Sequence, residues 1–227
     1  VGYMYGTPGS TNYDDTHANI NDSTIKEYID NWYEGKFLNT EYESYLSDTL
    51  FCSDRSLIKE ESFENEIGTF TQLGYGKEIT ASRGMGDYSF FMAASLEPFF
   101  ADYYNQLTTN PTLQCKQKND RFTVDDEEIG NGVLTYPVSL ITVDEIYLAG
   151  GSYLASNNGY YLYNGNNYWS LSPPYFSDDG ACVRLVYSVG SASFDRVNRN
   201  SGVRPVINLK AGSLKTGSGT ALDPYLV

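Results

Sequence analysis

The clearest periodic pattern of apolar residues lies between residues 21 and 37. Apolar side chains recur there every three or four positions, which places them on one side of a helix. Asp22 or Ser23 can act as the N-cap, and Gly35 is expected to end the helix. The pattern therefore predicts an amphipathic helix whose core-facing stripe consists of Ile25, Ile29, Trp32 and Tyr33.

Two shorter helices are also expected. The segment 42–50 is predicted to form a short helix that ends in a turn. Further along the chain, Thr142 and Glu145 have the spacing of a capping box, which opens a helix. This helix should follow a strand and stop at Gly150 or Gly151, since glycine readily adopts the conformation that ends a helix.

The remainder of the chain predicts short strands separated by Asn, Gly, Ser, Asp and Pro turns. The expected strands are "YYLY" (160–163), "NYWSL" (167–171), "ACVRLVYS" (181–188), "SFDRV" (193–197) and "VRPVINL" (203–209). With the helices they indicate an α+β fold in a single domain over residues 1–227. Within it, the segment 58–109 has no clear pattern and is expected to be loop-rich or inserted.

Two apolar segments frame the stretch between them. The expected core residues of these framing strands are Tyr168, Trp169 and Leu171 on one side and Val203, Val206, Ile207 and Leu209 on the other. Arg204 lies among them and is expected to join a buried polar network, because a buried guanidinium needs partners.

The residues between the framing strands are expected to form a surface. The two-residue period of a strand divides 181–188 into two faces. The core-facing set is Ala181, Val183 and Leu185, and the outward set is Cys182, Arg184, Val186 and Ser188. If Val197 also points inward, then Phe194, Arg196 and Asn198 face out, and Asn200 lies on the next turn.

Exposed Arg and aromatic residues beside small polar residues are typical of binding surfaces. The predicted ligand-binding residues are Tyr175, Ser177, Asp179, Arg184, Val186, Phe194, Arg196, Asn198 and Asn200. The alternative interpretation is an ordinary solvated face of a β domain, for which the same small polar residues are common.

Charge and composition narrow the function classes. A net charge of −14 disfavours nucleic acid and anionic membrane surfaces as partners. No stretch has the length of apolar sequence that a membrane span requires. Twenty-one Tyr and 21 Gly against three Met favour a rigid, β-rich extracellular module.

The sequence offers little catalytic chemistry. His17 is the only histidine and lies in a polar stretch, so it is expected on the surface or at a helix cap. Common hydrolase, zinc-protease and nucleotide-binding motifs are absent. The acidic run 124–132 lacks the ligand spacing of a calcium loop and is interpreted as a solvated turn. We therefore expect no enzyme, no cofactor and no metal site.

The cysteines leave two alternatives open. Cys52 and Cys115 have neither CxxC spacing nor histidine neighbours, which disfavours a metal site. They form either a single disulfide, which would indicate an oxidising compartment, or two buried thiols. Cys182 is the third cysteine and lies within the framed segment.

Several motifs in order carry a family resemblance. They are "VGYMYG", "HANINDSTIKEYIDNWY", "FCSDRS", "CKQKNDRFTV", "LTYPVSLITVDEIYLAGG", "YWSLSP", "GVRPVINLK" and "GSGTALDPYLV". The chain resembles surface-associated proteins of gut Firmicutes with a C-type-lectin-like domain, a fold distantly similar to that of the formylglycine-generating (sulfatase-modifying) enzymes. The resemblance implies two helices packed on a small twisted antiparallel sheet with long loops, and a ligand-facing C-terminal surface. Other members of this group are diversified by retroelements, and some follow a prepilin-type N-terminus.

Departures from characterised relatives remove two functions from this expectation. The chain has no EPN, QPD or WND motif, so calcium-dependent sugar binding is not expected. It also lacks paired cysteines in its C-terminal half, so formylglycine generation is not expected. Residues 146–209 contain no Lys, Glu, Gln or Met, which is compatible with adenine-directed diversification but also with ordinary strands and turns.

The leading hypothesis is a non-enzymatic, extracellular adhesion or recognition module that binds a protein or glycan at a cell surface. The alternative is a structural, pilin-like subunit whose C-terminal face packs on a neighbouring copy. The two hypotheses differ in whether the purified chain self-associates.

The division into framing strands and exposed segment is testable by stability. Trp169→Ala should lower the free energy of unfolding by about 3–5 kcal/mol because it removes a buried aromatic side chain. Arg196→Ala should change it by no more than about 0.5 kcal/mol, as a surface substitution does. Thermal melts of both variants measure the difference, and equal damage would contradict the division.

Overall fold

The structure is a computed structural model of the chain. It describes residues 18–54, 111, 113–115, 117–153, 155–173, 176–177, 180–220 and 222–226. The patternless segment 58–109 lies outside the described residues, as do His17, Tyr175 and Asp179.

The first described helix, α2, spans Thr24–Lys36. Ser23 is its N-cap and accepts the backbone N–H of Lys26 at 3.2 Å. The prediction that Gly35 ends the helix is wrong, because the helix continues to Lys36 and the N–H of Phe37 still donates to a carbonyl of its last turn. Exposed glycine weakens a helix but does not stop it when the backbone ladder continues. Of the predicted stripe, Ile29 and Tyr33 are buried and Ile25 and Trp32 pack half-buried against the same core.

The helix expected over 42–50 is shorter than predicted. Only Glu41–Tyr45 forms a turn of 3-10 helix, η1. The residues after it pair with the C-terminal chain instead, since Leu46 forms an antiparallel bridge with Leu209 and the N–H of Ser47 donates to the carbonyl of Asn208. The backbone groups that a longer helix would use are therefore already engaged.

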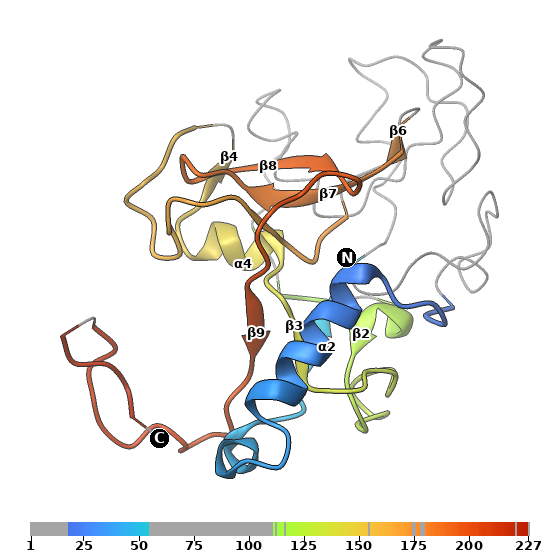
Figure 1. Cartoon of the computed structure of the whole chain (residues 1–227), viewed down its shortest axis with the longest axis vertical. Helices are drawn as coiled ribbons and strands as arrows, with labels where there is room; N and C mark the ends of the chain where they lie inside the picture. The colour runs from blue at the N-terminus through green and yellow to red at the C-terminus, as the bar shows by residue number, and fades with distance from the viewer. Residues whose placement is uncertain are drawn as a thin grey trace.

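The strands form small sheets that are mainly antiparallel (Figure 1). One pair joins β1 (Phe51–Cys52) to β2 (Arg121–Phe122), and another joins β3 (Val138–Leu140) to β9 (Pro205–Ile207). The largest sheet contains β4 (Ser152–Tyr153), β5 (Tyr168–Trp169), β7 (Gly180–Val186) and β8 (Ser191–Arg196) in the order β4-β8-β7-β5. The short strand β6 (Phe176–Ser177) pairs with the start of β7, and the 3-10 turn η4 (Lys118–Asp120) precedes β2. The described residues thus form an α+β fold.

The capping box is confirmed. Helix α4 spans Val143–Leu148, and its N-cap Thr142 accepts the N–H of Glu145 while the Glu145 carboxylate accepts the N–H of Thr142. The helix ends at Leu148 with Ala149 as its C-cap, just before the predicted stop at Gly150 or Gly151. Gly150 follows with a φ of +91°, a value that favours glycine.

The strand predicted at "YYLY" (160–163) is wrong. The segment is a turn in which the N–H of Tyr163 donates to the carbonyl of Tyr160. Tyr160 is buried and Tyr161 is 82% exposed. This alternation of burial is what a strand would give, but here it arises from the turn. The strand of this region is instead β4, which pairs in parallel with β8.

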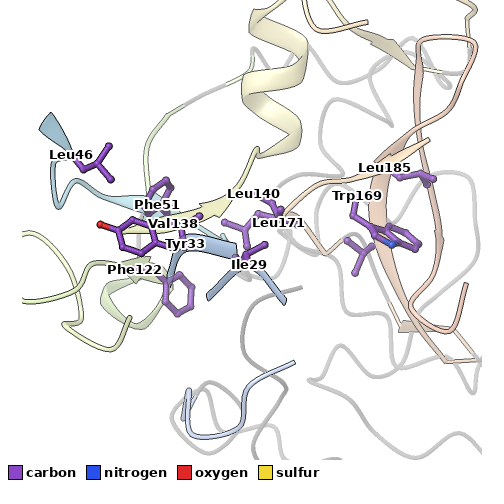
Figure 2. Close-up of a cluster of buried hydrophobic side chains, with 11 residues drawn as sticks. Ile29, Tyr33, Leu46, Phe51, Phe122, Val138, Leu140, Trp169, Leu171 and Leu185 are labelled. Atoms are coloured by element: carbon purple, nitrogen blue, oxygen red, sulfur yellow. The ribbon is translucent and has the colours of Figure 1, made fainter. Parts of the chain in front are cut away.

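One core cluster joins α2 to the sheets (Figure 2). Its buried members are Ile29, Tyr33, Leu46, Phe51, Phe122, Val138, Leu140, Trp169, Leu171, Val183 and Leu185. Of the second framing segment, Val203, Val206 and Ile207 pack half-buried against this cluster. The prediction for Leu209 is wrong: its side chain is 39% exposed, although its backbone pairs with the buried Leu46.

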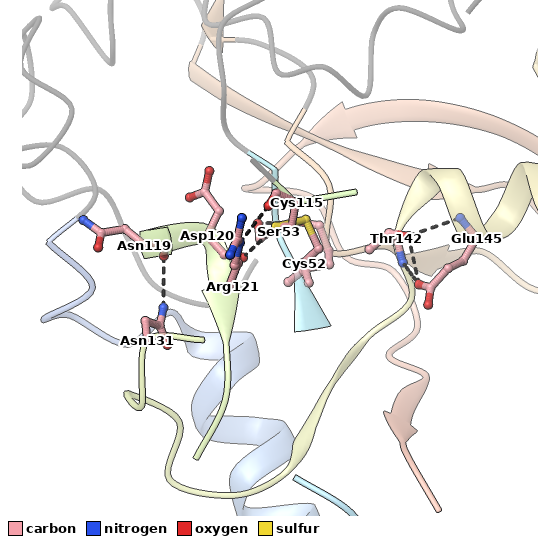
Figure 3. Close-up of a disulfide and its surroundings, with 10 residues drawn as sticks. Cys52, Ser53, Cys115, Asn119, Asp120, Arg121, Asn131, Thr142 and Glu145 are labelled. Carbon is pink, nitrogen blue, oxygen red and sulfur yellow. Dashed lines mark hydrogen bonds between the residues drawn. A yellow bond between two sulfur atoms is a disulfide. The ribbon is translucent and has the colours of Figure 1, made fainter. Parts of the chain in front are cut away.

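Of the two alternatives for the cysteines, the structure has the disulfide. Cys52 and Cys115 are bonded, with their Cα atoms 5.7 Å apart (Figure 3). Cys182 is buried and takes no part in a disulfide. Hydrogen bonds to backbone carbonyls surround the bridge: the N–H of Ser53 donates to the carbonyl of Asp120 at 3.0 Å, and the Arg121 side-chain Nε donates to the carbonyl of Cys115 at 2.7 Å. The disulfide therefore ties β1 to the segment before β2.

The acidic run 124–132 is a turn whose backbone is fixed by one carboxylate. The N–H groups of Val124, Asp125 and Asp126 donate to the Asp48 carboxylate at 2.7, 2.9 and 3.1 Å. Hydrogen bonds from neutral donors to an ionised acceptor are stronger than those between neutral groups. Asp48 thus holds this turn against the segment that follows η1.

Removal of this carboxylate should destabilise the chain. Asp48→Ala leaves three backbone donors without their acceptor and should lower the free energy of unfolding by about 2 kcal/mol. Asp125→Ala, an exposed carboxylate in the same turn, is the matched control and should change it by no more than about 0.5 kcal/mol. Chemical denaturation measures both, and an Asp48 variant as stable as the control would show that the clamp contributes nothing.

Candidate functional site

The framed segment forms the hairpin of β7 and β8. Its register places Cys182 opposite Arg196, Arg184 opposite Phe194, and Val186 opposite Ala192. Gly190 closes the turn with a φ of +79°, and a Cβ there would collide with the carbonyl of Asn157. Glycine is therefore required at this position, where the hairpin turn meets the chain that follows β4.

Both faces of β7 are buried. Val183 and Leu185 face the main core, as predicted. The opposite face is covered as well: Val186 packs in a second cluster whose buried members are Ile146, Tyr160, Tyr168, Val186 and Ala192. The prediction that Cys182, Arg184 and Val186 face outward is wrong, because all three side chains are buried; Val186 is covered by Ile146 of α4 and by Tyr160.

Arg184 is a core residue. Its exposed fraction is 0%, and its guanidinium carbon lies 5.8 Å from the ring centroid of Phe194 on the neighbouring strand. Its backbone is paired with the chain beyond β5, since the N–H of Arg184 donates to the carbonyl of Ser172 and its carbonyl accepts the N–H of Ser170, both at 2.9 Å. Arg184 and Val186 therefore support the sheet and do not contact solvent.

Exposure begins at the end of β8. Ser191 to Ser193 are buried, Phe194 to Arg196 are half-buried, and residues 197–200 are exposed. The prediction that Val197 points inward is wrong, because β8 ends at Arg196 and the chain turns, with the N–H of Arg199 donating to the carbonyl of Arg196 at 3.0 Å. The candidate site is thus the 196–200 turn, which consists of Arg196, Val197, Asn198, Arg199 and Asn200.

The structure retains part of the predicted set and adds one residue. Arg196, Asn198 and Asn200 lie together on the 196–200 turn. Arg199 was missed, since alternation along a strand says nothing about a position beyond its end. The pairing of Ser177 with Gly180, and of Cys182 with Arg196, brings β6 to the same end of β7 at which the turn begins (Figure 1).

The framing strand β5 is held by a polar cluster that contains Arg204 and Tyr168. The guanidinium of Arg204 stacks 4.8 Å from the ring centroid of Tyr168 and donates to the carbonyl of Leu162 at 2.6 Å. The hydroxyls of Tyr168 and Tyr160 are hydrogen-bonded to each other. Burial raises the pKa of Tyr168, and the charge of Arg204 opposes that shift. The predicted polar network around Arg204 is confirmed, and its contacts are structural.

A pocket of about 140 Å³ lies between β1 and α4. Of its lining residues, Figure 3 shows the disulfide-bonded Cys52, Thr142 and Glu145. It has an apolar floor that includes Phe51, Leu113 and Leu140, and carboxylates at Asp54, Asp144 and Glu145. The Glu145 carboxylate is engaged in the capping box. None of the predicted ligand-binding residues lines this pocket.

Across the described ranges, no cluster of three or more His, Cys, Asp or Glu side chains is arranged to hold a metal ion. Nor does any helix in that part of the chain have the length and apolar character needed to cross a bilayer. Searches against protein-family models, curated proteins and solved structures find no match to this chain. The fold and the candidate site therefore stand on the geometry of the chain itself.

Burial separates Arg184 from the residues of the 196–200 turn. Arg184→Ala should lower the free energy of unfolding by about 3 kcal/mol, because it removes a buried stem and leaves the groups around the guanidinium without their partner. Arg184→Met keeps an unbranched stem and should cost less. Asn198→Ala should stay within about 0.5 kcal/mol of the parent. Denaturant titrations compare the three variants. An Arg184→Ala variant as stable as Asn198→Ala would contradict the assignment of Arg184 to the core.

Proposed function

We propose that this chain is a non-enzymatic, extracellular recognition module with a C-type-lectin-like fold that binds a protein or glycan ligand at a cell surface. The observation that carries the proposal is the 196–200 turn, whose residues 197–200 are exposed and which lies at the end of a hairpin with largely buried strands. A rigid support with an exposed polar turn is the arrangement that recognition loops use.

The chemistry of the turn favours an acidic ligand. Arg196 and Arg199 bring two guanidinium groups into one short turn of a chain whose net charge is −14. Guanidinium groups bind carboxylates and sulfates through paired hydrogen bonds. Asn198 and Asn200 add amide donors and acceptors that suit glycan hydroxyls or peptide groups. An acidic glycan or an acidic protein segment therefore fits the turn best.

The disulfide supports an extracellular location. Cys52 and Cys115 are bonded across 63 positions of sequence, and disulfides persist in oxidising compartments. The high Tyr and Gly content and the low Met content agree with this location.

Three of the described carboxylates have structural roles. Asp126 accepts the N–H groups of Glu128 and Ile129 at 3.0 Å, and Asp48 accepts three further backbone donors. Glu145 caps α4. Each of these carboxylates stabilises a turn or a helix start, so their present hydrogen bonds assign them a structural role.

The structural-subunit hypothesis is the second candidate. The observation that favours it is a projecting C-terminal segment with exposed apolar side chains, among them Leu222, Tyr225 and Leu226. In this hypothesis the C-terminal segment, and not the 196–200 turn, packs on a neighbouring copy. Mutations can therefore distinguish the two functions.

A binding screen tests the proposed function. The purified chain is applied to an array of acidic and neutral glycans and to surface proteins, with and without a calcium chelator. The test variant combines Arg196→Ala, Asn198→Ala, Arg199→Ala and Asn200→Ala. Ligand affinity should fall by about tenfold or more in this variant, since each charged hydrogen bond contributes more than a neutral one.

The matched control removes one cation and one amide elsewhere. Asn31→Ala with Lys36→Ala changes two exposed residues of α2 and should leave the affinity unchanged. Binding that survives in the turn variant, or that is lost equally in the control, would contradict the site. A folded chain that binds nothing on either array would contradict the function.

A further inference from the structure

The loop between β4 and β5 presents two tyrosines to solvent. Tyr161 is 82% exposed and Tyr163 is 37% exposed, whereas their neighbours Tyr160 and Leu162 pack in the second core cluster, with Ile146 of α4. The N–H of Tyr163 donates to the carbonyl of Tyr160 at 3.0 Å, which closes the turn that carries all four side chains. The two outward rings therefore project from a turn whose inward residues belong to the core.

Hydrogen bonds hold both sides of this loop. The N–H of Asn157 donates to the carbonyl of Val189 at 3.0 Å, and the Asn157 side-chain amide donates to the carbonyl of Gly150 at 2.7 Å. On the other side of the loop, the N–H of Ser188 donates to the side-chain oxygen of Asn167 at 2.7 Å. A ligand that binds here meets a backbone that is already ordered, so less conformational entropy is lost on binding.

Two glycines lie beside the ring of Tyr163. A Cβ at Gly190 would lie 3.1 Å from Cδ2 of this ring, and a Cβ at Gly165 would lie 3.8 Å from its hydroxyl oxygen. Gly190 thus supports one edge of the ring with backbone alone, and Gly165 adds no side chain beside the hydroxyl. The ring is therefore held in place without side chains from these two positions that would stand over it.

Exposed amide side chains accompany the two rings in the same loop. They belong to Asn158, Asn164 and Asn166. The side-chain oxygen of Asn164 accepts the N–H of Asn166 at 3.0 Å, and the Asn166 side-chain amide donates to the backbone carbonyl of Asn164 at 3.1 Å. Each amide group has two N–H donors and an acceptor oxygen, so these side chains retain hydrogen-bonding capacity beyond the bonds inside the loop.

The loop has no charge of its own. Residues 146–177 contain no Asp, Glu, Lys, Arg or His, in a chain whose net charge is −14. Arg204 does reach the loop, but its guanidinium donates to the carbonyl of Leu162 at 2.6 Å and stacks on the ring of Tyr168. An ionised ligand would lose hydration at this loop without meeting an opposite charge on it, so the loop favours a neutral ligand.

A neutral sugar matches these features. The C–H groups of a pyranose ring form apolar faces that pack on the electron-rich faces of aromatic rings. Sugar hydroxyls both donate and accept hydrogen bonds, as amide side chains do. Protein interfaces are enriched in Arg and Met as well as in aromatic residues, and residues 146–177 contain neither Arg nor Met. The composition of the loop therefore favours a sugar over a protein partner.

We infer that the β4–β5 loop is a second binding site, in which Tyr161 and Tyr163 take a neutral oligosaccharide. The loop contacts the 187–190 end of the β7–β8 hairpin, and the 196–200 turn lies at the other end of β8. In Figure 1 the loop that follows β4 and the strand β6 lie at opposite ends of this hairpin. At about 3.4 Å per residue, the six residues of β8 separate the two sites by about 20 Å. The inference is therefore independent of the ligand proposed at the 196–200 turn.

Binding of uncharged oligosaccharides tests the inference. The full chain is screened against a panel of oligosaccharides of glucose, galactose, mannose, fucose and N-acetylglucosamine, and calorimetry measures the affinity for the best-bound member. Tyr161→Ala with Tyr163→Ala should lower that affinity by about tenfold or more, because both stacking surfaces are lost. Tyr161→Phe with Tyr163→Phe keeps both rings and should retain most of the affinity.

Two further variants separate binding from folding. Tyr161 has little packing to lose, so Tyr161→Ala alone should melt like the parent chain and still bind the sugar more weakly. The matched control, Tyr28→Ala with Tyr42→Ala, removes exposed tyrosines of α2 and η1 and should leave the affinity unchanged. A parent chain that binds no member of the panel, or loop variants that bind like the control, would overturn the inference. Loss of a protein ligand in the loop variants, with no sugar bound, would assign the loop to a protein partner instead.

Salt and the turn variant distinguish this site from the 196–200 turn. The affinity for the neutral sugar should stay unchanged between about 0.1 and about 0.5 M salt, whereas binding of an acidic ligand by Arg196 and Arg199 weakens because salt screens charges. The variant that combines four alanine substitutions in the 196–200 turn should keep the neutral sugar, and the tyrosine variant should keep the acidic ligand. A turn variant that loses the neutral sugar as fully as the tyrosine variant does would contradict a separate second site.

Discussion

The structure depends on the burial of β7 from both sides. This strand pairs with β5, β6 and β8, so its hydrogen bonds organise the largest sheet. Val183 and Leu185 join the core that α2, β1 and β3 complete, and Val186 joins the cluster below α4. A strand with two covered faces has no freedom to expose alternate side chains, and every functional surface of this hairpin must therefore lie at its ends.

The local elements were predictable where short-range chemistry specifies them. The spacing of Ile29 and Tyr33 on α2 follows from the helical period, and the Thr142–Glu145 box is complete within four residues. The outward face predicted for β7 failed for a long-range reason. Alternation along a strand separates two faces but does not show whether a second layer covers the polar one. Arg184 is fully buried, and Val186, on the same face, packs against α4 and Tyr160.

The candidate site likewise contains residues that the sequence predicts and residues that it does not. Strand alternation predicts Asn198 on the outward face and Asn200 on the turn that follows, and the structure exposes both, although Asn198 lies on the turn and not on the strand. Alternation does not assign Arg199 to the surface and points Val197 toward the core. Both errors arise because the strand ends at Arg196, one residue before its predicted end. The Asp48 clamp was beyond sequence reasoning altogether, since its donors lie 76 to 78 positions away along the chain.

The position of the exposed residues limits where this chain can vary. A substitution on β7 meets packed side chains on either face, and a Cβ at Gly190 meets the carbonyl of Asn157. Residues 197–200 differ, since their side chains are exposed while the backbone on both sides is held, by β8 before them and by the hydrogen bonds between Gly202 and Asn167 and between Trp169 and Gly202 after them. The two requirements of a recognition surface, a fixed backbone and replaceable side chains, therefore coincide on these four residues. Substitutions after β8 that preserve the fold are thus expected at 197–200 rather than on the strands of the hairpin.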